Sequence, residues 1–334
     1  MSDFVQGSQR KEEQKGRQSL VFVGDVGGTN ARFAIADLSD RTKPLLSHGL
    51  SLRAAEYETL EAAIAAYLPA AGVAPPPATV IDIAGPVING EATMTNLSWH
   101  ISEAKLKLIG FLEAKLINDF SALAAAAEVL DERDVAPIGP AERYAPARTV
   151  ALIGAGTGLG VSALIREDGA SIVLASEGGH IGFSPGNELE VDVYRILSRR
   201  FGHVSTERVA SGPGLVNLYE ALCELRGAAA EFHDPPAIST EAQRGPGLCR
   251  EVVELFFAIM GSVAGDVALM FGANAVLLTG GVTTALQSFL QASAFRMRFE
   301  AKGRMSKYLQ AIPTYLITRK DAALLGCARI ASQM

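Results

Sequence analysis

The sequence predicts an α/β fold built from two similar sheet domains. Residues 19–38 and residues 149–175 each hold apolar residues at period-two spacing on both sides of a glycine-rich turn, as in "FVGDVGGTNARF". This pattern is typical of a strand, a tight turn and a second strand. The two motifs begin about 130 residues apart, which indicates a duplicated structural unit. Because ligands bind preferentially between the halves of such proteins, we expect a central cleft to hold the site.

The other elements of the first half follow from apolar spacing and from proline. Apolar residues recur at helical spacing across 54–68, which predicts a helix. A strand is expected near 79–84, after the proline-rich stretch "APPPA". A further strand is expected over 114–119, directly before an Ala-rich helix.

The second half continues the alternation of strands and helices. A third strand is expected after the hairpin within 149–175, and a buried strand that ends in Gly-Gly is expected over 274–282. We expect the last helix to pack back on the N-terminal domain. The helices predicted here span 188–202, 214–228, 250–270 and 321–333.

These elements predict three segments of chain. Residues 1–18 form a polar extension that we expect to be disordered, since they carry few apolar residues. Residues 19–128 together with 316–334 form a smaller α/β domain, and residues 129–315 form a larger one.

Composition narrows the class of protein. The net charge is −6 and the isoelectric point about 5.5, whereas nucleic-acid binding needs a basic surface. The three cysteines, Cys223, Cys249 and Cys327, form no C-x-x-C pair, which favours reduced thiols in the cytoplasm and argues against a zinc site. We found no apolar run approaching the roughly 18 residues of a membrane span, and the first 18 residues lack the apolar core of a signal peptide.

The two glycine turns are the phosphate candidates. They read "GDVGGTN" (24–30) and "GAGTGLG" (154–160), and such turns can direct backbone N–H groups at an anion. A P-loop is excluded because the chain has no Gly-Lys pair. The dinucleotide fingerprint is disfavoured because neither turn has its spacing or opens a helix. Plain hairpin turns remain the alternative.

Neither turn contains lysine, so a bound phosphate would need backbone dipoles and a metal ion. Thr29 and Thr157 lie in the middle of the two turns and offer hydroxyl groups. Asp25 is the carboxylate expected to hold Mg²⁺, directly or through water. Capping of the hairpin by an Asx-turn is the alternative role for Asp25.

Asp119 lies in "AKLINDFSAL", at the junction of a predicted strand and a predicted helix. One interpretation is a helix N-cap, because Asn and Asp oxygens accept hydrogen bonds from the first free N–H groups. The other is a carboxylate held at the carboxyl end of a strand, where α/β proteins bind ligands. The positive end of the helix would keep such a carboxylate ionised.

Several longer motifs together resemble one family. The chain is similar, from about residue 20 to its C-terminus, to bacterial glucokinases, which belong to the sugar kinase, actin and heat-shock chaperone ATPase superfamily. The resemblance implies two ribonuclease-H-like (actin-like ATPase) domains around a central cleft, and transfer of the γ-phosphate of Mg·ATP to the 6-hydroxyl of D-glucose at the entry to glycolysis. The shared motifs, in order, are "GDVGGTNARFAIAD", "AGPV", "TNLSW", "LINDFSALA", "GAGTGLG", "SEGGHIGF", "ERVASGPGLVNLYEAL" and "LTGGV".

The resemblance also implies roles for residues of this chain. Asp119 would be the general base and would bind glucose together with Asn118, Glu177, His180 and Glu207. The residues expected to bind ATP are Gly24, Asp25, Gly27, Gly28, Thr29, Asn30, Gly156, Thr157, Gly158, Gly280 and Gly281. "FSPGNE" follows "GHIG" where zinc-containing relatives have a Cys-rich loop, so no zinc is expected. The resemblance further suggests a homodimer.

Other functions stay open on the sequence alone. Glu177 and Glu207 would more often be solvated surface acids, and His180 a histidine with a local partner. A kinase for another hexose, such as mannose, fructose or glucosamine, would share the same site residues, and an acetate- or glycerol-type kinase would share the fold. A sugar-responsive transcription regulator would need a DNA-binding module, which residues 1–18 are too short to supply. An actin-like assembly protein would hydrolyse ATP without sugar.

Overall fold

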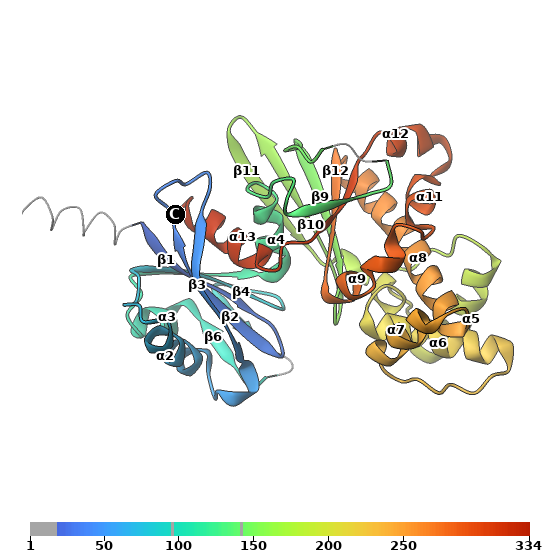
Figure 1. Ribbon diagram of the computed structural model, residues 1–334, viewed down its shortest axis with the longest axis horizontal. Helices are drawn as coiled ribbons and strands as arrows, with labels where there is room; N and C mark the ends of the chain where they lie inside the picture. The colour runs from blue at the N-terminus through green and yellow to red at the C-terminus, as the bar shows by residue number, and fades with distance from the viewer. Residues whose placement is uncertain (1–18, 95–96, 141–142) are drawn as a thin grey trace, which may run out of the picture. The chain divides into compact units, whose positions relative to one another are not determined.

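The computed structural model describes residues 19–94, 97–140 and 143–334 (Figure 1). The extension 1–18 and the first two residues of the "TNLSW" motif lie outside the described residues. Two compact units are distinguished by their internal contacts. Unit 1 contains the chain up to Leu130 together with Lys320–Met334, and unit 2 contains Asp131–Arg319.

Unit 1 contains a five-stranded sheet in the order β3-β2-β1-β4-β7. Strands β1, β2 and β3 are antiparallel neighbours, whereas β4 and β7 run parallel to β1. The predicted glycine hairpin is confirmed as β1 and β2, while β3 was not predicted. The strands of unit 1, including the small ribbon β5-β6, are β1 (Leu20–Val26), β2 (Asn30–Asp37), β3 (Leu45–Arg53), β4 (Ala78–Ile83), β5 (Glu91–Thr93), β6 (His100–Ser102) and β7 (Glu113–Asn118).

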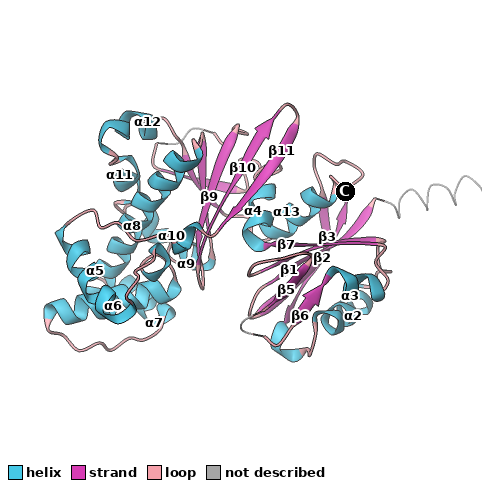
Figure 2. Ribbon diagram, turned by 180° about the vertical axis from the view of Figure 1, so that it is seen from behind, coloured by secondary structure: helices cyan, strands magenta, loops and turns pink. Residues whose placement is uncertain are grey.

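Helices cover both faces of this sheet. Figures 1 and 2 show α2 and α3 on one face and α4 and α13 on the other. The expected docking of the C-terminal helix is confirmed, since α13 packs against α4, β1 and β4. The helices of unit 1 are η1 (Ala54–Glu56), α2 (Leu60–Ala71), α3 (Glu103–Leu108), α4 (Asp119–Ala126) and α13 (Ala322–Ala331).

The predicted start of the first long helix is wrong by six residues. Helix α2 begins at Leu60, because the Thr59 hydroxyl caps it by accepting a hydrogen bond from Ala62 N at 3.1 Å. The residues before the cap form the short turn η1. The helix ends at Gly72, whose φ of 66° is the left-handed conformation common at helix C-termini.

Unit 2 contains a six-stranded sheet in the order β11-β10-β9-β12-β13-β8. The strands β11, β10, β9, β12 and β13 repeat the topology of unit 1. Neighbours among β11, β10 and β9 are antiparallel, whereas β12 and β13 run parallel to β9. The expected domain boundary at residue 316 falls inside β13, which pairs with β12 and belongs wholly to unit 2. The strands are β8 (Val135–Ile138), β9 (Thr149–Ala155), β10 (Leu159–Glu167), β11 (Ala170–Ser176), β12 (Ala275–Thr279) and β13 (Thr314–Ile317).

Helix α8 (Leu248–Phe271) forms the core of unit 2. Its length and apolar composition would suffice to cross a membrane, contrary to our reading of the sequence, but 78% of its most apolar stretch is buried in the protein. It packs against α6, α7 and α11 and against strands β9 and β12, as core helices do. The remaining helices are η2 (Gly178–His180), α5 (Glu188–Phe201), η3 (Thr206–Arg208), α6 (Gly212–Arg226), α7 (Pro235–Arg244), α9 (Gly281–Ala285), α10 (Gln287–Leu290), α11 (Phe295–Glu300), η4 (Gly303–Met305) and α12 (Ser306–Gln310).

Candidate functional site

The junction of β7 and α4 is capped by Asn118 rather than by Asp119. Asn118 Oδ1 accepts hydrogen bonds from Phe120 N at 2.9 Å and from Ser121 N at 3.3 Å. Its Nδ2 donates to Gly85 O at 3.1 Å. Asp119 is the first residue of α4, and its carboxylate is therefore not needed to cap the helix.

The Asp119 carboxylate is held in place by its neighbours. Its Oδ1 accepts hydrogen bonds from Asn118 Nδ2 at 2.9 Å and from Phe120 N at 3.0 Å. Burial raises the pKa of Asp119 to about 6, although the Phe120 N–H acts in the opposite direction. Burial thus outweighs the expected stabilisation of the charge by the helix. At neutral pH the carboxylate is still mostly ionised and is poised to accept a proton.

Two further carboxyl groups lie near the carboxyl ends of the parallel strands of unit 1. Asp25 of β1 and Asp82 of β4 are direct partners in the strand register. Burial raises the pKa of Asp25, which the Arg32 guanidinium, 3.1 Å away, opposes. Burial, followed by the charges of Asp25 and Asp119, raises the pKa of the fully buried Asp82 well above its usual range. Such deep burial favours the protonated form of the Asp82 carboxyl group.

Sequence reasoning missed both Asp82 and Arg32. A signal for Asp82 was present, because it is the one acidic residue in the apolar run "TVIDIAG", and buried acids are rare without a partner. Cys327 of α13 provides one contact, with its Sγ 3.3 Å from Asp82 Oδ2. Arg32 had no comparable signal, since its role depends on the hairpin that brings it opposite Asp25.

The carboxyl groups of unit 1 fit a magnesium ion that is bound mainly by phosphate. Asp82 Oδ1 is buried and receives no hydrogen bond from a donor group, so a proton shared with Asp25 or a cation would satisfy it. Among residues 19–94, 97–140 and 143–334, no three or more His, Cys, Asp or Glu side chains gather as a metal cluster. Mg²⁺ in kinases needs only one or two carboxylates, because water and phosphate supply its other ligands.

The first glycine turn contains fewer residues than the predicted range 24–30. Gly27 N donates to Asn30 O at 2.9 Å, which leaves Gly28 and Thr29 at the tip of the hairpin. Gly24 lies inside β1, where a Cβ atom would be only 3.2 Å from Ile81. A side chain at Gly24 would therefore crowd the packing of the sheet, and Gly24 is not part of the turn itself.

The second glycine turn contacts two other segments of unit 2. Gly156 N donates to Gly158 O, and Gly156 O accepts from Gly212 N, both at 2.8 Å. Gly212 opens α6 behind the N-cap Ser211, so the N-terminus of this helix lies beside the turn. This contact was not predicted, although Ser followed by Gly-Pro is a helix-start signal.

Gly280 lies near the same turn, between β12 and α9, and Gly281 is the first residue of α9. Gly280 has a φ of 97°, and a Cβ atom there would be 2.3 Å from Ala155 O. Only glycine fits this position. Thr157 is exposed at the tip of the second turn. The predicted nucleotide residues of unit 2 are therefore brought together around the end of β9.

The predicted sugar residues of unit 2 also gather beside the second turn. Glu207 Oε2 accepts a hydrogen bond from Leu159 N at 2.9 Å. Glu177 and His180 are exposed, with Glu177 Oε2 3.9 Å from His180 Nε2. The segment that carries them passes close to β10, because a Cβ atom on Gly179 would be 2.0 Å from Leu159 O.

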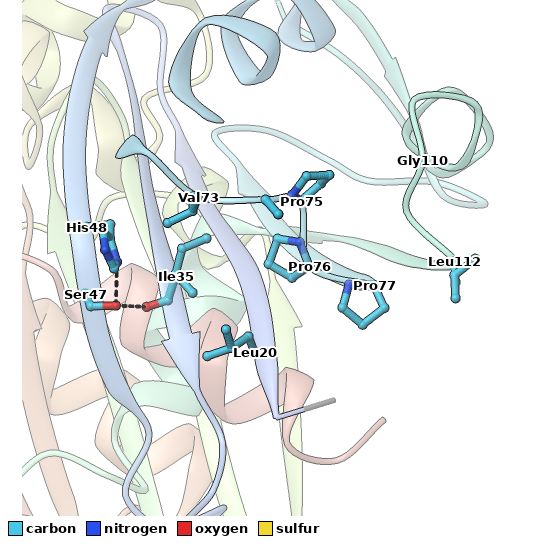
Figure 3. Close-up of a pocket in the computed structure, with 11 residues that line it drawn as sticks. Leu20, Ile35, Ser47, His48, Val73, Pro75, Pro76, Pro77, Gly110 and Leu112 are labelled. Carbon is cyan, nitrogen blue, oxygen red and sulfur yellow. Dashed lines mark hydrogen bonds between the residues drawn. The ribbon is translucent and has the colours of Figure 1, made fainter. Parts of the chain in front are cut away.

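A cavity of about 900 Å³ lies at the opposite edge of the sheet of unit 1 (Figure 3). Leu20, Pro77 and Leu112 line it, and each lies at or just before the amino end of a parallel strand. Its polar side chains are Ser47 and His48, whose Oγ and Nδ1 lie 2.9 Å apart. The residues that line it include no charged side chain and none of the predicted site residues, so it does not fit a phosphate.

Known proteins provide an independent comparison. The family model described as Glucokinase matches residues 22–334. The glucokinase of Caulobacter sp. (strain K31) is 41% identical over 311 residues, which cover 92% of this chain and 94% of that protein. The glucokinase of Chromobacterium violaceum is 44% identical over 311 residues, covering 92% of this chain and 88% of that protein.

Solved structures agree. A glucokinase from an Antarctic psychrotroph is similar with a TM-score of 0.85 and 34% identity, over 95% of this chain and 99% of that one. A ROK family glucokinase from Streptomyces griseus, in complex with glucose and AMPPNP, has a TM-score of 0.63 and 20% identity, over 94% of this chain and 100% of that one. Because the identity to the Streptomyces griseus protein is only 20%, that similarity shows a shared fold alone.

Proposed function

Because the chain belongs to the glucokinase family, we propose that it is an ATP-dependent glucokinase that transfers the γ-phosphate of ATP to the 6-hydroxyl of D-glucose. The single observation that carries the mechanism is the fixed carboxylate of Asp119 at the junction of β7 and α4. The product, glucose 6-phosphate, enters glycolysis.

Asp119 acts as the general base. Both hydrogen bonds from Asn118 and Phe120 end on Oδ1, so Oδ2 takes the proton of the 6-hydroxyl as that oxygen attacks the γ-phosphorus. A base with a pKa of about 6 is ionised at neutral pH yet remains basic enough to accept the proton. Asn118 orients the base. Its Nδ2 group already donates to Gly85 O and Asp119 Oδ1, so a sugar hydroxyl that binds Asn118 would compete for the same donor.

The two glycine turns bind the phosphates of ATP. Gly27, Gly28, Thr29 and Asn30 of unit 1 supply backbone and hydroxyl donors. Gly156, Thr157 and Gly158 form the corresponding turn of unit 2, with Gly280 and Gly281 nearest the nucleoside. The adjacent N-terminus of α6 adds a positive dipole end.

Asp25 would hold Mg²⁺, directly or through water, and the bound ion would neutralise charge on the phosphates. Arg32 keeps the Asp25 carboxylate in place through the contact at 3.1 Å. Asp82 lies opposite Asp25 in the strand register, and its raised pKa favours a proton on this carboxyl group, which would lower the charge that the site must bury.

Glu177, His180 and Glu207 bind the other hydroxyls of the sugar. Carboxylates can accept two hydrogen bonds each, which suits the vicinal hydroxyls of a hexose. Glu207 contacts Leu159 N in this structure, and one carboxylate oxygen can keep that contact while the other accepts from the sugar.

Three further features belong to the same proposal. The repeated strand order of the two sheets supports a pair of ribonuclease-H-like domains. The cysteines are free and buried, which suits the reducing cytoplasm. The functional form is a homodimer, as the family resemblance suggests.

A coupled assay of ADP release with Mg·ATP and a panel of hexoses tests the function. We expect fast turnover with glucose, and little without sugar. Faster turnover with mannose, fructose or glucosamine would assign the chain to a different hexose. Turnover that does not depend on any sugar would favour an actin-like ATPase, and the absence of turnover would favour a sugar-responsive regulator.

A further inference from the structure

Among the described residues of unit 2, Glu190 has a fully buried carboxylate that the proposed mechanism leaves unused. Glu190 lies in the first turn of α5, and its side chain is 0% exposed. Arg298 of α11 donates to Oε1 through Nη1 at 2.5 Å and to Oε2 through Nη2 at 3.1 Å. Such a bidentate pair fixes both side chains in direction as well as in distance.

The same carboxylate also holds the loop that precedes α5. Glu190 Oε2 accepts a hydrogen bond from Gly186 N at 2.6 Å, and Oε1 accepts from Asn187 Nδ2 at 3.0 Å. Asn187 in turn caps α5 by accepting from Glu190 N at 2.9 Å. The Arg298 guanidinium lies so close to this loop that a Cβ atom on Gly186 would be 2.1 Å from Nη2.

The same connection between β11 and α5 begins with two of the proposed sugar ligands, Glu177 directly before η2 and His180 at its end. Downstream of His180, the segment is tied to residues 203–206: Thr206 N donates to Ile181 O at 2.8 Å, and Phe183 N donates to Val204 O at 2.9 Å. The contact of Glu190 with Gly186 fixes its far end, three residues after Phe183. The segment between η2 and α5 is therefore held at two places, one of which depends on Arg298.

We propose that Glu190 and Arg298 form a clamp that positions the sugar-binding segment 177–187 relative to Glu207. Arg298 and Glu190 are positioning residues, since neither is required to touch the sugar. The inference rests on the proposed function, because it assigns the clamp to the affinity for glucose. A buried ion pair is weak evidence for stability by itself. Here, four hydrogen bonds from three residues end on one carboxylate, and together they fix the position of the loop before α5.

The test compares two arginines of α11. Arg298→Met removes the guanidinium but keeps the apolar stem. Arg296→Met is the matched control, because Arg296 is equally buried and pairs with Glu300 at 2.5 Å, but its partners lie outside segment 177–190. We expect Arg298→Met to raise KM for glucose roughly tenfold. A displacement of a binding group by about 1 Å can lower the rate of an enzyme by about 100-fold, and we expect a smaller displacement here because residues 203–206 still hold the segment. KM for ATP should stay within about twofold, and Arg296→Met should leave KM for glucose within about twofold.

Two further variants keep the proposal falsifiable. Arg298→Lys retains the charge without the fork, so we expect a KM for glucose between those of the wild type and Arg298→Met. If Arg298→Met does not fold, the double variant Glu190→Gln, Arg298→Met leaves no unpaired buried charge and should show the same rise. An unchanged KM for glucose in the folded variant, or an equal rise in Arg296→Met, would overturn the clamp.

Hydrogen exchange separates this inference from the proposed function. We expect the amides of residues 181–187 to exchange at least tenfold faster in Arg298→Met than in the wild type, and at the wild-type rate in Arg296→Met. This readout does not require turnover. A wild type that does not phosphorylate glucose would overturn the proposed function, whereas unchanged exchange in Arg298→Met would overturn the clamp.

Discussion

The acidic residues proposed for the site differ between the two units in how burial affects them. In unit 1, Asp25, Asp82 and Asp119 are at least partly buried at the ends of adjacent parallel strands, and burial raises the pKa of each. In unit 2, Glu177 is exposed and Glu207 is held by a backbone N–H. Burial of a carboxyl group increases its basicity, whereas exposure leaves it free to bind hydroxyl groups. Under the proposed function, this difference suits proton transfer by unit 1 and binding of the other sugar hydroxyls by unit 2.

The largest expected effect comes from removing the base in unit 1. Asp119→Asn keeps the shape and the acceptor for Asn118 but cannot take a proton. We expect kcat to fall by about 10²–10⁴-fold, with glucose binding by calorimetry nearly unchanged. Glu177→Gln is the comparison in unit 2, and it should weaken binding more than it lowers kcat. Activity retained by Asp119→Asn would remove the base role.

The second expected effect concerns the metal. Asp25→Asn should raise the Mg²⁺ concentration needed for half-maximal activity by about 10–100-fold, a range typical for lost metal support. The measurement is a Mg²⁺ titration at saturating glucose and a fixed ATP concentration. Asp37→Asn, on the exposed end of β2, is the control. An unchanged Mg²⁺ requirement in Asp25→Asn would exclude Asp25 as a ligand.

The pH dependence of activity follows from the pKa of Asp119. Since the base must be ionised and its pKa is about 6, kcat/KM should be constant above pH 7 and should fall about tenfold for each pH unit below about 6. The measurement is a pH–rate profile between pH 4.5 and pH 8.5, with Mg²⁺ in excess. A profile that stays flat down to pH 4.5 would contradict the raised pKa.

Recognition by unit 2 should respond to smaller changes. Glu207→Gln replaces a charged acceptor by a neutral one, so we expect KM for glucose to rise about tenfold, because hydrogen bonds to charged groups contribute about 1.5–3 kcal/mol. The Gln oxygen can still accept from Leu159 N, so stability should change little. A fall in kcat without a change in KM would instead place Glu207 in the chemistry.

The last expected effect concerns the stability of unit 1 rather than its activity. The folded state binds the Asp119 proton more tightly than the unfolded state does, since the pKa rises from 3.8 to about 6. Below about pH 4 the group is protonated in both states, so its burial does not lower the free energy of unfolding. As the pH rises from about 4 to about 6, the unfolded state ionises first and the free energy of unfolding falls. Above that pH, Asp119→Asn should be more stable than the wild type by up to roughly 3 kcal/mol, less where water reaches the carboxylate. The measurement is thermal unfolding of Asp119→Asn and of the wild type at pH 4 and at pH 7.5. An equal stability difference between the two proteins at both pH values would contradict an origin in the ionisation of Asp119.

Local patterns predicted the glycine hairpins, the junction of β7 and α4 and the long helices, because each depends on residues close in sequence. The start of α2 was wrong, since the cap at Thr59 stopped a helix that spacing alone extended back to residue 54. Strand β3 was missed because most of its residues are exposed and give no apolar alternation. Helix α8 was predicted over 250–270, but its length and apolar composition were not recognised as sufficient to span a membrane, and its burial inside unit 2 is what identifies it as a core helix.

The sequence by itself determined the two hairpin turns, the acid at the end of β7 and the order of motifs that shows the family. Only the tertiary structure decided how those groups behave. It made Asn118 the cap of α4, buried the neighbouring Asp119, placed Asp82 opposite Asp25 on the adjacent strand, and joined Arg298 to Glu190 over 108 residues. The physical reason is that pKa values and buried ion pairs depend on desolvation and on neighbours brought together by folding, and neither is encoded in local spacing.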